Sequence, residues 1–279
     1  MIRHLPVSVI EQAVTSLLTT AAYQLPADYL AAMRRAQQQE QSSLGNQIIL
    51  MLLHNAAYAE AEQIPTCQDT GMAMLYLAIG QEVHFTDGDL ESTLQQAVRN
   101  AYTNLRKSVV DDPLLRRNTG DNTPAIIHYT LVPGDRVRVT ALMKGFGAEL
   151  MSRLQMFPPS VGVAGIKRFV LETVELAGPN ACPPLIVGVG VGGSFDTVAH
   201  LAKQALLRPI GQPNPQAHLA QLEAELLTAI NELGIGPQGF GGQTTALAVH
   251  VEAYATHIAA LPVAVNMNCS APRRATVEI

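Results

Sequence analysis

The chain has 279 residues, of which 48% are hydrophobic and 15% are charged. This is enough for a large core in one big domain or two small ones, while a net charge of −5 without basic runs argues against nucleic acid as a partner. No stretch reaches about 18 consecutive apolar residues and the N-terminus lacks the apolar run of a signal peptide, so we expect a cytoplasmic protein without a membrane span.

Helices are predicted first along the chain, over residues 7–62, because apolar residues recur there at helical spacing. Ser8 and Glu11 have the spacing of a capping box, which predicts a helix with Ser8 as its N-cap. A strand over 74–80 and a helix over 89–107 follow.

Two further strand-like runs, 125–132 and 135–143, flank a Pro-Gly-Asp turn and predict a β-hairpin. The elements predicted after it are a helix over 164–178 that stops at Gly178, a strand over 183–190, helices over 192–207 and 213–234, and strands over 244–254 and 261–268. This order predicts a mixed α/β (α+β) fold, with a helical N-terminal region of about residues 1–62 before layered sheets and helices. We see no repeat or linker and expect a single catalytic unit over residues 1–279.

Residues 188–193, GVGVGG, have the G-x-G-x-x-G spacing of a dinucleotide-binding turn between a strand and a helix. That turn needs an acidic residue about 20 positions further on to hold the ribose, yet no Asp or Glu lies between Asp196 and Glu223. Arg208, which would suit a 2′-phosphate, falls at a predicted helix end. The glycines therefore indicate a close backbone approach rather than dinucleotide binding.

The three cysteines share their surroundings, since each stands beside proline, asparagine or glycine on a predicted turn. They are Cys67 in PTCQDTG, Cys182 in GPNACPP and Cys269 in NMNCSAPRR. One interpretation is three unrelated thiols, because free cysteine is often a small buried hydrophobe. Turns flanked by proline and glycine are poor places for such residues, however, and an odd count argues against a disulfide framework.

A metal centre is the other interpretation. Structural zinc usually takes closely spaced ligands such as C-x-x-C, and this chain has none. Three widely separated thiolates suit an iron–sulfur cluster better, and since such a cluster normally takes four cysteines, one iron would stay open to substrate as a Lewis acid. Asp69, two residues after Cys67, could then supply the proton that a leaving hydroxyl needs.

Several motifs in order resemble the class I, iron–sulfur fumarate hydratase family, in its N-terminal domain or separate α subunit. The matching stretches are PTCQDTGM, RRNTGDNTPA, NACPPLIVGVGVGG, ALLRPIG, LGIGPQGFGGQTTALAV and THIAALPVAVNMNC, over roughly residues 40–275. The α subunit of L-tartrate dehydratase shares many of them. The resemblance implies a 4Fe–4S cluster with one open iron, ligated by Cys67, Cys182 and Cys269.

The same resemblance assigns the surrounding residues. Asp69 would be an acid/base group and His257 would pair with the acid/base machinery, while Gln68 would face the substrate and Arg106 would clamp one of its carboxylates. Arg116, Asp121 and Asn122 are second-tier candidates, expected to hold their own loop rather than to react. Each assignment has a structural alternative, such as Asp69 capping a turn or Arg106 lying on a solvated helix.

Two departures from the family pattern concern the substrate. Gly145 and Gly147 of KGFGAELMS would lend backbone N–H groups to it, but Ala148 and Leu150 stand where the family has a polar Ser and Asn. After the third cysteine the chain reads SAPRR, whereas the family often has HxxRH. Both changes leave the cluster ligands intact and put the exact substrate in doubt.

These features predict the α subunit of a 4Fe–4S-dependent hydro-lyase that reversibly dehydrates a small 2-hydroxy dicarboxylate, with malate to fumarate as the first choice. L-tartrate and a citramalate-type acid are the alternatives of the same class, and a non-enzymatic iron–sulfur redox or sensor protein is the alternative of another. A substrate with two carboxylates needs a cationic side chain at each end, and Arg106 is the one convincing candidate. Arg273 and Arg274 are adjacent in the sequence, so their side chains need not point the same way. The resemblance accordingly implies a β subunit like the family's C-terminal domain, in a heterotetramer.

Overall fold

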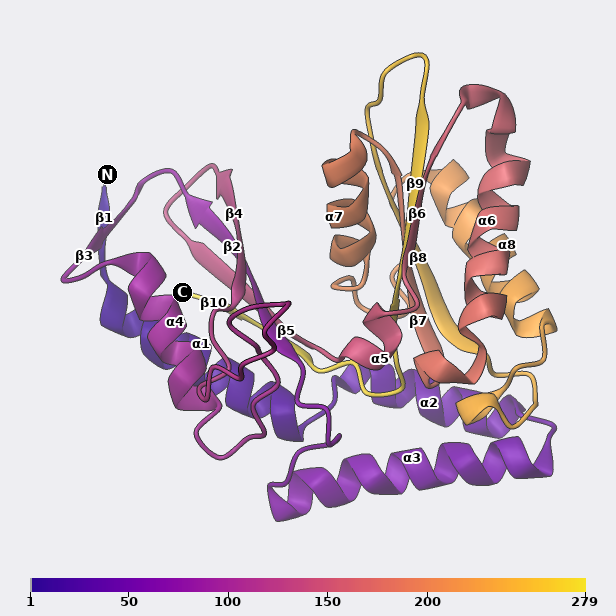
Figure 1. Ribbon diagram of the computed structural model, residues 1–279, viewed down its shortest axis with the longest axis horizontal. Helices are drawn as coiled ribbons and strands as arrows, with labels where there is room; N and C mark the ends of the chain where they lie inside the picture. The colour runs from indigo at the N-terminus through magenta and orange to yellow at the C-terminus, as the bar shows by residue number, and fades with distance from the viewer. Residues whose placement is uncertain (1) are drawn as a thin grey trace. The chain divides into compact units, whose positions relative to one another are not determined.

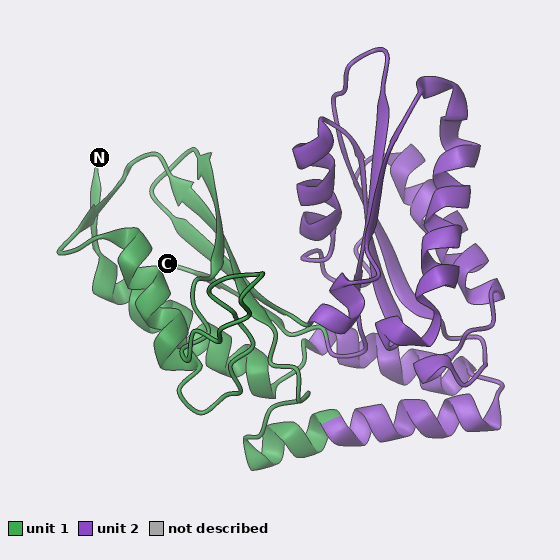
Figure 2. Cartoon of the chain, viewed as in Figure 1, with its two compact units in different colours: residues 1–26, 56–145, 272–279 green, residues 27–55, 146–271 purple. Residues whose placement is uncertain are grey.

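A computed structural model describes residues 2–279 and divides the chain into two compact units (Figure 2). Unit 1 comprises residues 1–26, 56–145 and 272–279, and unit 2 comprises residues 27–55 and 146–271. The predicted mixed α/β fold is confirmed (Figure 1). The expected single catalytic unit is a statement about function and stays a prediction.

Unit 1 is built on a four-stranded sheet in the order β10-β5-β2-β4. Alternate residues of β2, among them Ala73, Leu75 and Leu77, enter one core with α1 and α4, as the two-residue period of a strand requires. The bounds are α1 Val7–Tyr23, β2 Met72–Gly80, α4 Leu90–Ala101, β4 Ile126–Val132, β5 Val137–Lys144 and β10 Arg274–Glu278, while β1 Arg3–Pro6 and β3 Val83–Thr86 form a separate parallel pair.

The predicted hairpin is wrong, because β2 lies between the two strands that the Pro-Gly-Asp turn joins. β4 pairs with β2 in parallel and β5 pairs with it antiparallel. The turn therefore crosses the end of β2 at Gly80, whose N–H donates to the carbonyl of Arg136 at 2.8 Å. A Cβ at Gly80 would lie 2.3 Å from the carbonyl oxygen of Gly134, so the crossing requires glycine.

The helical N-terminal region is confirmed as α1, α2 Ala27–Gln39 and α3 Ser43–Glu62. The predicted cap is wrong, because Pro6 is the N-cap of α1 and Ser8 lies inside the first turn. β1 runs directly into this helix, and no side chain caps it. The next helix, α4, has a side-chain N-cap, since the carboxylate of Asp89 accepts a hydrogen bond from the N–H of Ser92 at 2.7 Å.

Unit 2 is layered, with α7 on one face of a sheet and α6 and α8 on the other (Figure 1). The strand order is β6-β9-β7-β8, with β7 paired in parallel to β8 and antiparallel to β9. The bounds are α5 Phe146–Glu149, β6 Arg153–Phe157, α6 Gly162–Ala177, β7 Leu185–Gly192, α7 Phe195–Ala205, α8 Ala217–Glu232, β8 Ala246–Tyr254 and β9 Leu261–Asn268. Within residues 2–279, no helix combines the length and the apolar character needed to cross a bilayer.

The glycine-rich stretch after the start of β7 serves helix packing. A Cβ at Gly188 would lie 2.1 Å from the carbonyl oxygen of Ala202, and one at Gly190 would lie 2.2 Å from that of Val198. Both carbonyls belong to α7, so the glycines let this helix lie directly on the sheet. Arg208 is the other residue of the rejected dinucleotide site. Its side chain is 12% exposed and pairs with the buried carboxylate of Glu223.

A buried carboxylate holds the loop before β8. Glu40, which is 8% exposed, accepts hydrogen bonds from the backbone N–H groups of Ser42, Gln243 and Thr244 at 2.9–3.1 Å. Burial acts to raise the pKa of Glu40, but these donors outweigh it and the net pKa lies below the usual 4.5. The carboxylate thus ties the α2–α3 connection to residues 242–244 within unit 2.

Replacing this carboxylate by its amide is expected to destabilise unit 2 in a pH-dependent way. Glu40→Gln should lower the free energy of unfolding by about 2 kcal/mol at pH 7, since charge-assisted bonds weaken and one amide N–H faces donors. Because the folded pKa is depressed, the contribution exists above about pH 4.5 and disappears as the pH falls through the folded pKa. Denaturant unfolding of both proteins between pH 3 and 7 checks this, and a gap that does not change with pH would contradict it.

Candidate functional site

The turn that carries Cys67 is fixed by backbone hydrogen bonds in unit 1. The carboxylate of Asp69 accepts from the N–H of Gly71 at 2.9 Å, and the hydroxyl of Thr70 donates to the carbonyl of Arg106 at 2.5 Å. The Cys67 thiol lies 3.6 Å from the side-chain oxygen of Gln68. The turn therefore presents the side chains of residues 67–69 while its backbone is anchored.

Buried polar residues hold this turn from behind. The hydroxyl of Tyr102, fully buried, donates to the carbonyls of Thr70 and Gly71 at 3.0 and 3.2 Å. The buried amide of Asn122 donates to Gly71 at 3.2 Å and accepts from the N–H of Ser108 at 2.6 Å. Asn122 of the loop 116–122 thus supports the turn, and nothing in the sequence singled out Tyr102.

A cavity of about 440 Å³ opens beside this turn in unit 1. Its lining brings together three of the predicted site residues, Gln68, Asp69 and Arg106, with Lys107 nearby. Lys107 uses its ammonium group to bond the carbonyl of Thr103 at 2.8 Å, while no hydrogen bond or ion pair to the guanidinium of Arg106 is found within residues 2–279. An amide, a carboxylate and an exposed cation on one cavity can orient a small anion and move a proton at it.

The other two cysteines lie together in unit 2. The N–H of Ser270, next to Cys269, donates to the carbonyl of Cys182 at 3.0 Å. Cys182 is exposed and has a left-handed backbone, φ 55°, at the end of a short 3₁₀ turn, and Cys269 follows β9 directly. The two thiols therefore stand on adjacent backbone segments.

Two further residues hold this pair of segments. The side-chain amide of Gln238 donates to the carbonyl of Pro183 at 2.7 Å and to the hydroxyl of Ser270 at 3.0 Å. The buried Tyr29 donates to the carbonyl of Ser270 at 2.6 Å. Burial, helped by negative charge at Cys269, raises the pKa of Tyr29 far above its usual range, so the phenol remains a neutral donor. Neither residue has a role predicted from the sequence, although Gln238 lies in the matching stretch LGIGPQGFGGQTTALAV.

The donor set has the chemistry of an iron–sulfur site. None of the three cysteines forms a disulfide, and Cys67 lies in unit 1 while Cys182 and Cys269 lie in unit 2. Soft thiolates suit iron–sulfur clusters and are poor ligands for magnesium or calcium. Over residues 2–279 no three or more His, Cys, Asp and Glu side chains, the cysteines included, are grouped closely enough to hold a metal ion, so the ligand set rests on the chemistry of the thiols.

The structure does not bring His257 to the cysteines of unit 2. His257 is exposed before β9, where its ring accepts from the N–H of Ala259 at 3.2 Å, and Cys269 follows the opposite end of that strand. A strand of 8 residues spans roughly 26 Å at about 3.3 Å per residue. The catalytic role expected for His257 thus receives no support from the geometry of unit 2 and stays a prediction.

The two glycines of the KGFG segment, Gly145 and Gly147, differ in how much space a side chain would have. A Cβ at the buried Gly145 would lie 3.1 Å from a carboxylate oxygen of Asp69, so a side chain there would press on that group. A Cβ at Gly147 would meet only the carbonyl of Asn180 at 3.7 Å, an ordinary contact. Of the two residues in this segment that depart from the family pattern, Ala148 is buried and Leu150 is 73% exposed.

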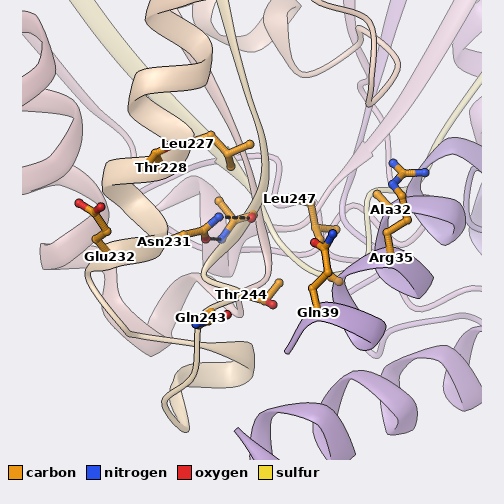
Figure 3. A pocket seen from close by; sticks show the side chains of 12 residues that line it. Ala32, Arg35, Gln39, Leu227, Thr228, Asn231, Glu232, Gln243, Thr244 and Leu247 are labelled. Carbon is orange, nitrogen blue, oxygen red and sulfur yellow. Dashed lines mark hydrogen bonds between the residues drawn. The ribbon is translucent and has the colours of Figure 1, made fainter. Parts of the chain in front are cut away.

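A separate groove of about 480 Å³ lies in unit 2 between α2, α8 and the start of β8 (Figure 3). Arg35 and Gln39 of α2 face it from one side, and Asn231 of α8 faces it from the other. Asn231 is occupied in holding β8, since its oxygen accepts from the N–H of Ala246 at 2.8 Å. The residues that line this groove include none of the predicted site residues.

Comparison with known proteins decides the family. A family model described as fumarate hydratase (Fumerase) matches residues 11–278. The chain belongs to the fumarate hydratase family. This is a family of hydro-lyases, so the resemblance and the enzyme class predicted from the sequence are both confirmed.

Relatives of the chain carry tartrate dehydratase names. A Methanocaldococcus jannaschii protein with the provisional name L(+)-tartrate dehydratase subunit alpha is 40% identical over 278 residues, covering 97% of this chain and 97% of its own length. The L(+)-tartrate dehydratase subunit alpha of Escherichia coli K12 is 35% identical over 270 residues, or 95% of this chain and 88% of its own length. A Shigella sonnei protein of the same name matches equally.

Proposed function

We propose that the chain is the cluster-bearing α subunit of a hydro-lyase that dehydrates a 2-hydroxy dicarboxylate, with L(+)-tartrate as the first substrate. The observation that carries the proposal is the cavity of unit 1, where Gln68, Asp69 and Arg106 line one space beside a cysteine-bearing turn. The family of hydro-lyases to which the chain belongs supports the reaction type.

The choice of L(+)-tartrate reverses the order expected from the sequence, which favoured malate. The names of the relatives support tartrate, and one of them is 40% identical over almost the whole chain. Malate, and next a citramalate-type acid, remain the second candidates because all these substrates share a carboxylate, a hydroxyl on the neighbouring carbon and a hydrogen on the carbon after that.

The residues of unit 1 would share the work of the elimination. Arg106 would pair with one carboxylate of the substrate, and the amide of Gln68 would bond a substrate oxygen. In its protonated form Asp69 would give its proton to the departing hydroxyl, so that the hydroxyl leaves as water, while a base expected from the partner subunit takes the proton from the neighbouring carbon. Its carboxylate is already held by the N–H of Gly71, which fixes its direction.

An iron–sulfur cluster is part of the proposal, with Cys67, Cys182 and Cys269 as its ligands. When bound, a 4Fe–4S cluster with one iron free of thiolate supplies Lewis acidity toward the substrate hydroxyl. The three cysteines outside any disulfide support this assignment, and the reducing cytoplasm expected from the sequence is a compartment in which they would stay reduced.

A partner chain is the remaining part. The relatives named subunit alpha support a β subunit, and a substrate with two carboxylates needs a second cation besides Arg106. The first part of α3, residues 43–55, contains no Asp, Glu, Lys or Arg, yet it exposes Leu44, Leu50 and Met51 by 47, 37 and 66%. Uncharged, apolar exposure of this kind suits a surface that another subunit covers, and we infer a heterotetramer.

Substrate choice is the direct test of the function. The chain and its partner, purified together without oxygen and loaded with iron and sulfide, should dehydrate L(+)-tartrate with at least about tenfold higher kcat/KM than malate. The chain alone should be inactive, because it holds half of the cationic site. Activity with malate alone would return the assignment to fumarate hydration, and full turnover by the isolated chain would contradict the need for a partner.

A further inference from the structure

An arginine that the sequence left undecided is buried beside the candidate acid. Arg273 is 1% exposed and lies just before β10, where its carbonyl accepts from the N–H of Met143 at 2.9 Å. This bond continues the pairing of β10 with β5 and fixes the backbone of Arg273 at the end of the sheet of unit 1. A charged side chain so completely enclosed needs groups that compensate for the loss of water.

The group beside it is Asp69. A Cβ built on Gly145 would lie 3.3 Å from a terminal nitrogen of Arg273 and 3.1 Å from a carboxylate oxygen of Asp69, so the two side chains flank the same point. Both groups also affect the pKa of Tyr102. Burial raises this pKa most, Arg273 acts to lower it and Asp69 acts to raise it. The Nε of Arg273 has no hydrogen-bond partner among residues 2–279.

Asp69 and Arg273 differ in their access to the cavity. Asp69 lines the space of about 440 Å³, whereas Arg273 does not and is closed to solvent. The guanidinium of Arg273 is therefore closed off from the cavity that Asp69 lines. One oxygen of Asp69 is held by Gly71, and the other faces the point that it shares with Arg273.

We propose that Arg273 is a positioning residue, which holds the carboxylate of Asp69 in the direction needed for proton transfer and does not itself touch the substrate. This inference rests on the acid/base role proposed for Asp69. The positive charge of a buried guanidinium close to a carboxylate favours the orientation in which a carboxylate oxygen faces that charge, and it acts strongly where water is excluded. A side chain at position 145 would crowd both groups, since its Cβ would lie 3.1 Å from Asp69 and 3.3 Å from Arg273.

A double-mutant cycle in the loaded complex tests the inference. Arg273→Gln should lower kcat by about 10- to 100-fold with KM changed less than about twofold, and Arg273→Lys should recover part of the loss. In an Asp69→Asn background the same Arg273 changes should cost little more, because a residue that acts through Asp69 has nothing left to position. Titration calorimetry with succinate, a dicarboxylate that has no hydroxyl to lose, should give the same Kd for wild type and Arg273→Gln.

Arg138→Gln is the matched control, because Arg138 is exposed on β5 of the same sheet. It should leave kcat, KM and the Kd for succinate unchanged. Losses that multiply in the double variant, or a raised KM and weakened succinate binding in Arg273→Gln, would overturn the positioning role while leaving the function intact. Full activity of Asp69→Asn would instead remove the proposed role of Asp69 and this inference with it. Should Arg273→Gln fail to fold, the cycle with Arg273→Lys decides by the same criterion.

Discussion

Asp69→Asn should leave the loaded complex with its full iron content and lower kcat for L(+)-tartrate by about 100-fold or more, the usual scale for a lost acid/base group. The amide has the shape of the carboxylate and can still accept from the N–H of Gly71, so the turn and its cysteine should stay in place. Rate measurements under nitrogen, paired with iron analysis of the same samples, check both halves of the expectation.

Asp111→Asn is a suitable control for this variant. Asp111 is an exposed carboxylate in the same unit that pairs with Arg117 at 3.2 Å, and it does not line the cavity. Its replacement should change kcat by less than about twofold, as is usual at exposed positions away from a site. Loss of iron in Asp69→Asn would show that the carboxylate maintains the structure of the turn and would leave its part in the reaction unsupported. An unchanged kcat at full iron content would show that the carboxylate has neither role.

Cysteine replacement should have the other large effect. Cys67→Ser, Cys182→Ser and Cys269→Ser should each prevent stable loading, whereas the wild-type chain should take up about four irons per chain on anaerobic reconstitution. A hydroxyl is a far weaker ligand for iron than a thiolate, so activity should fall to background in all three variants. Iron and sulfide analysis together with the visible absorption of the reconstituted protein measures the loading.

The loading experiment has its control in His257→Asn. His257 is exposed, and β9 separates it from Cys269, so this change should keep all the iron. A cysteine variant that retains full iron and activity is not a ligand, and the assignment of three thiolates would then be wrong. Iron loss in His257→Asn would contradict the separation seen in unit 2.

Local patterns predicted most of the elements of the fold but not how the strands pair. Helical spacing and the stop at Gly178 gave helices that agree with α1 to α3 and α6. The hairpin failed because a short turn between two strands normally joins neighbours, and the crossing of β2 depends on a contact between Gly80 and Gly134 that no local pattern contains. The short strands β1, β3, β6 and β10 lacked a sufficient alternating run.

The candidate site was likewise predictable only where its residues are neighbours in the sequence or stand in a matched motif. Gln68 and Asp69 are neighbours in the sequence, and the structure brings Arg106 to the same cavity. Their roles stay predictions. Arg273 could not be assigned, because its direction depends on the pairing of β10 with β5 across more than a hundred residues. The separation of His257 from Cys269 likewise became visible only once β9 was known to run between them.

The central claim is that this chain belongs to an enzyme that removes water from its substrate and does not oxidise it. One measurement tests this claim directly. The loaded complex of the chain and its partner should be incubated with L(+)-tartrate under nitrogen, with no electron acceptor present, and the oxaloacetate formed should be counted. Dehydration is redox-neutral, so the account predicts many turnovers, with one oxaloacetate for each tartrate consumed. Product that forms only when an electron acceptor is added, or no product from tartrate or malate at full iron loading, would contradict it and favour a redox or sensor protein.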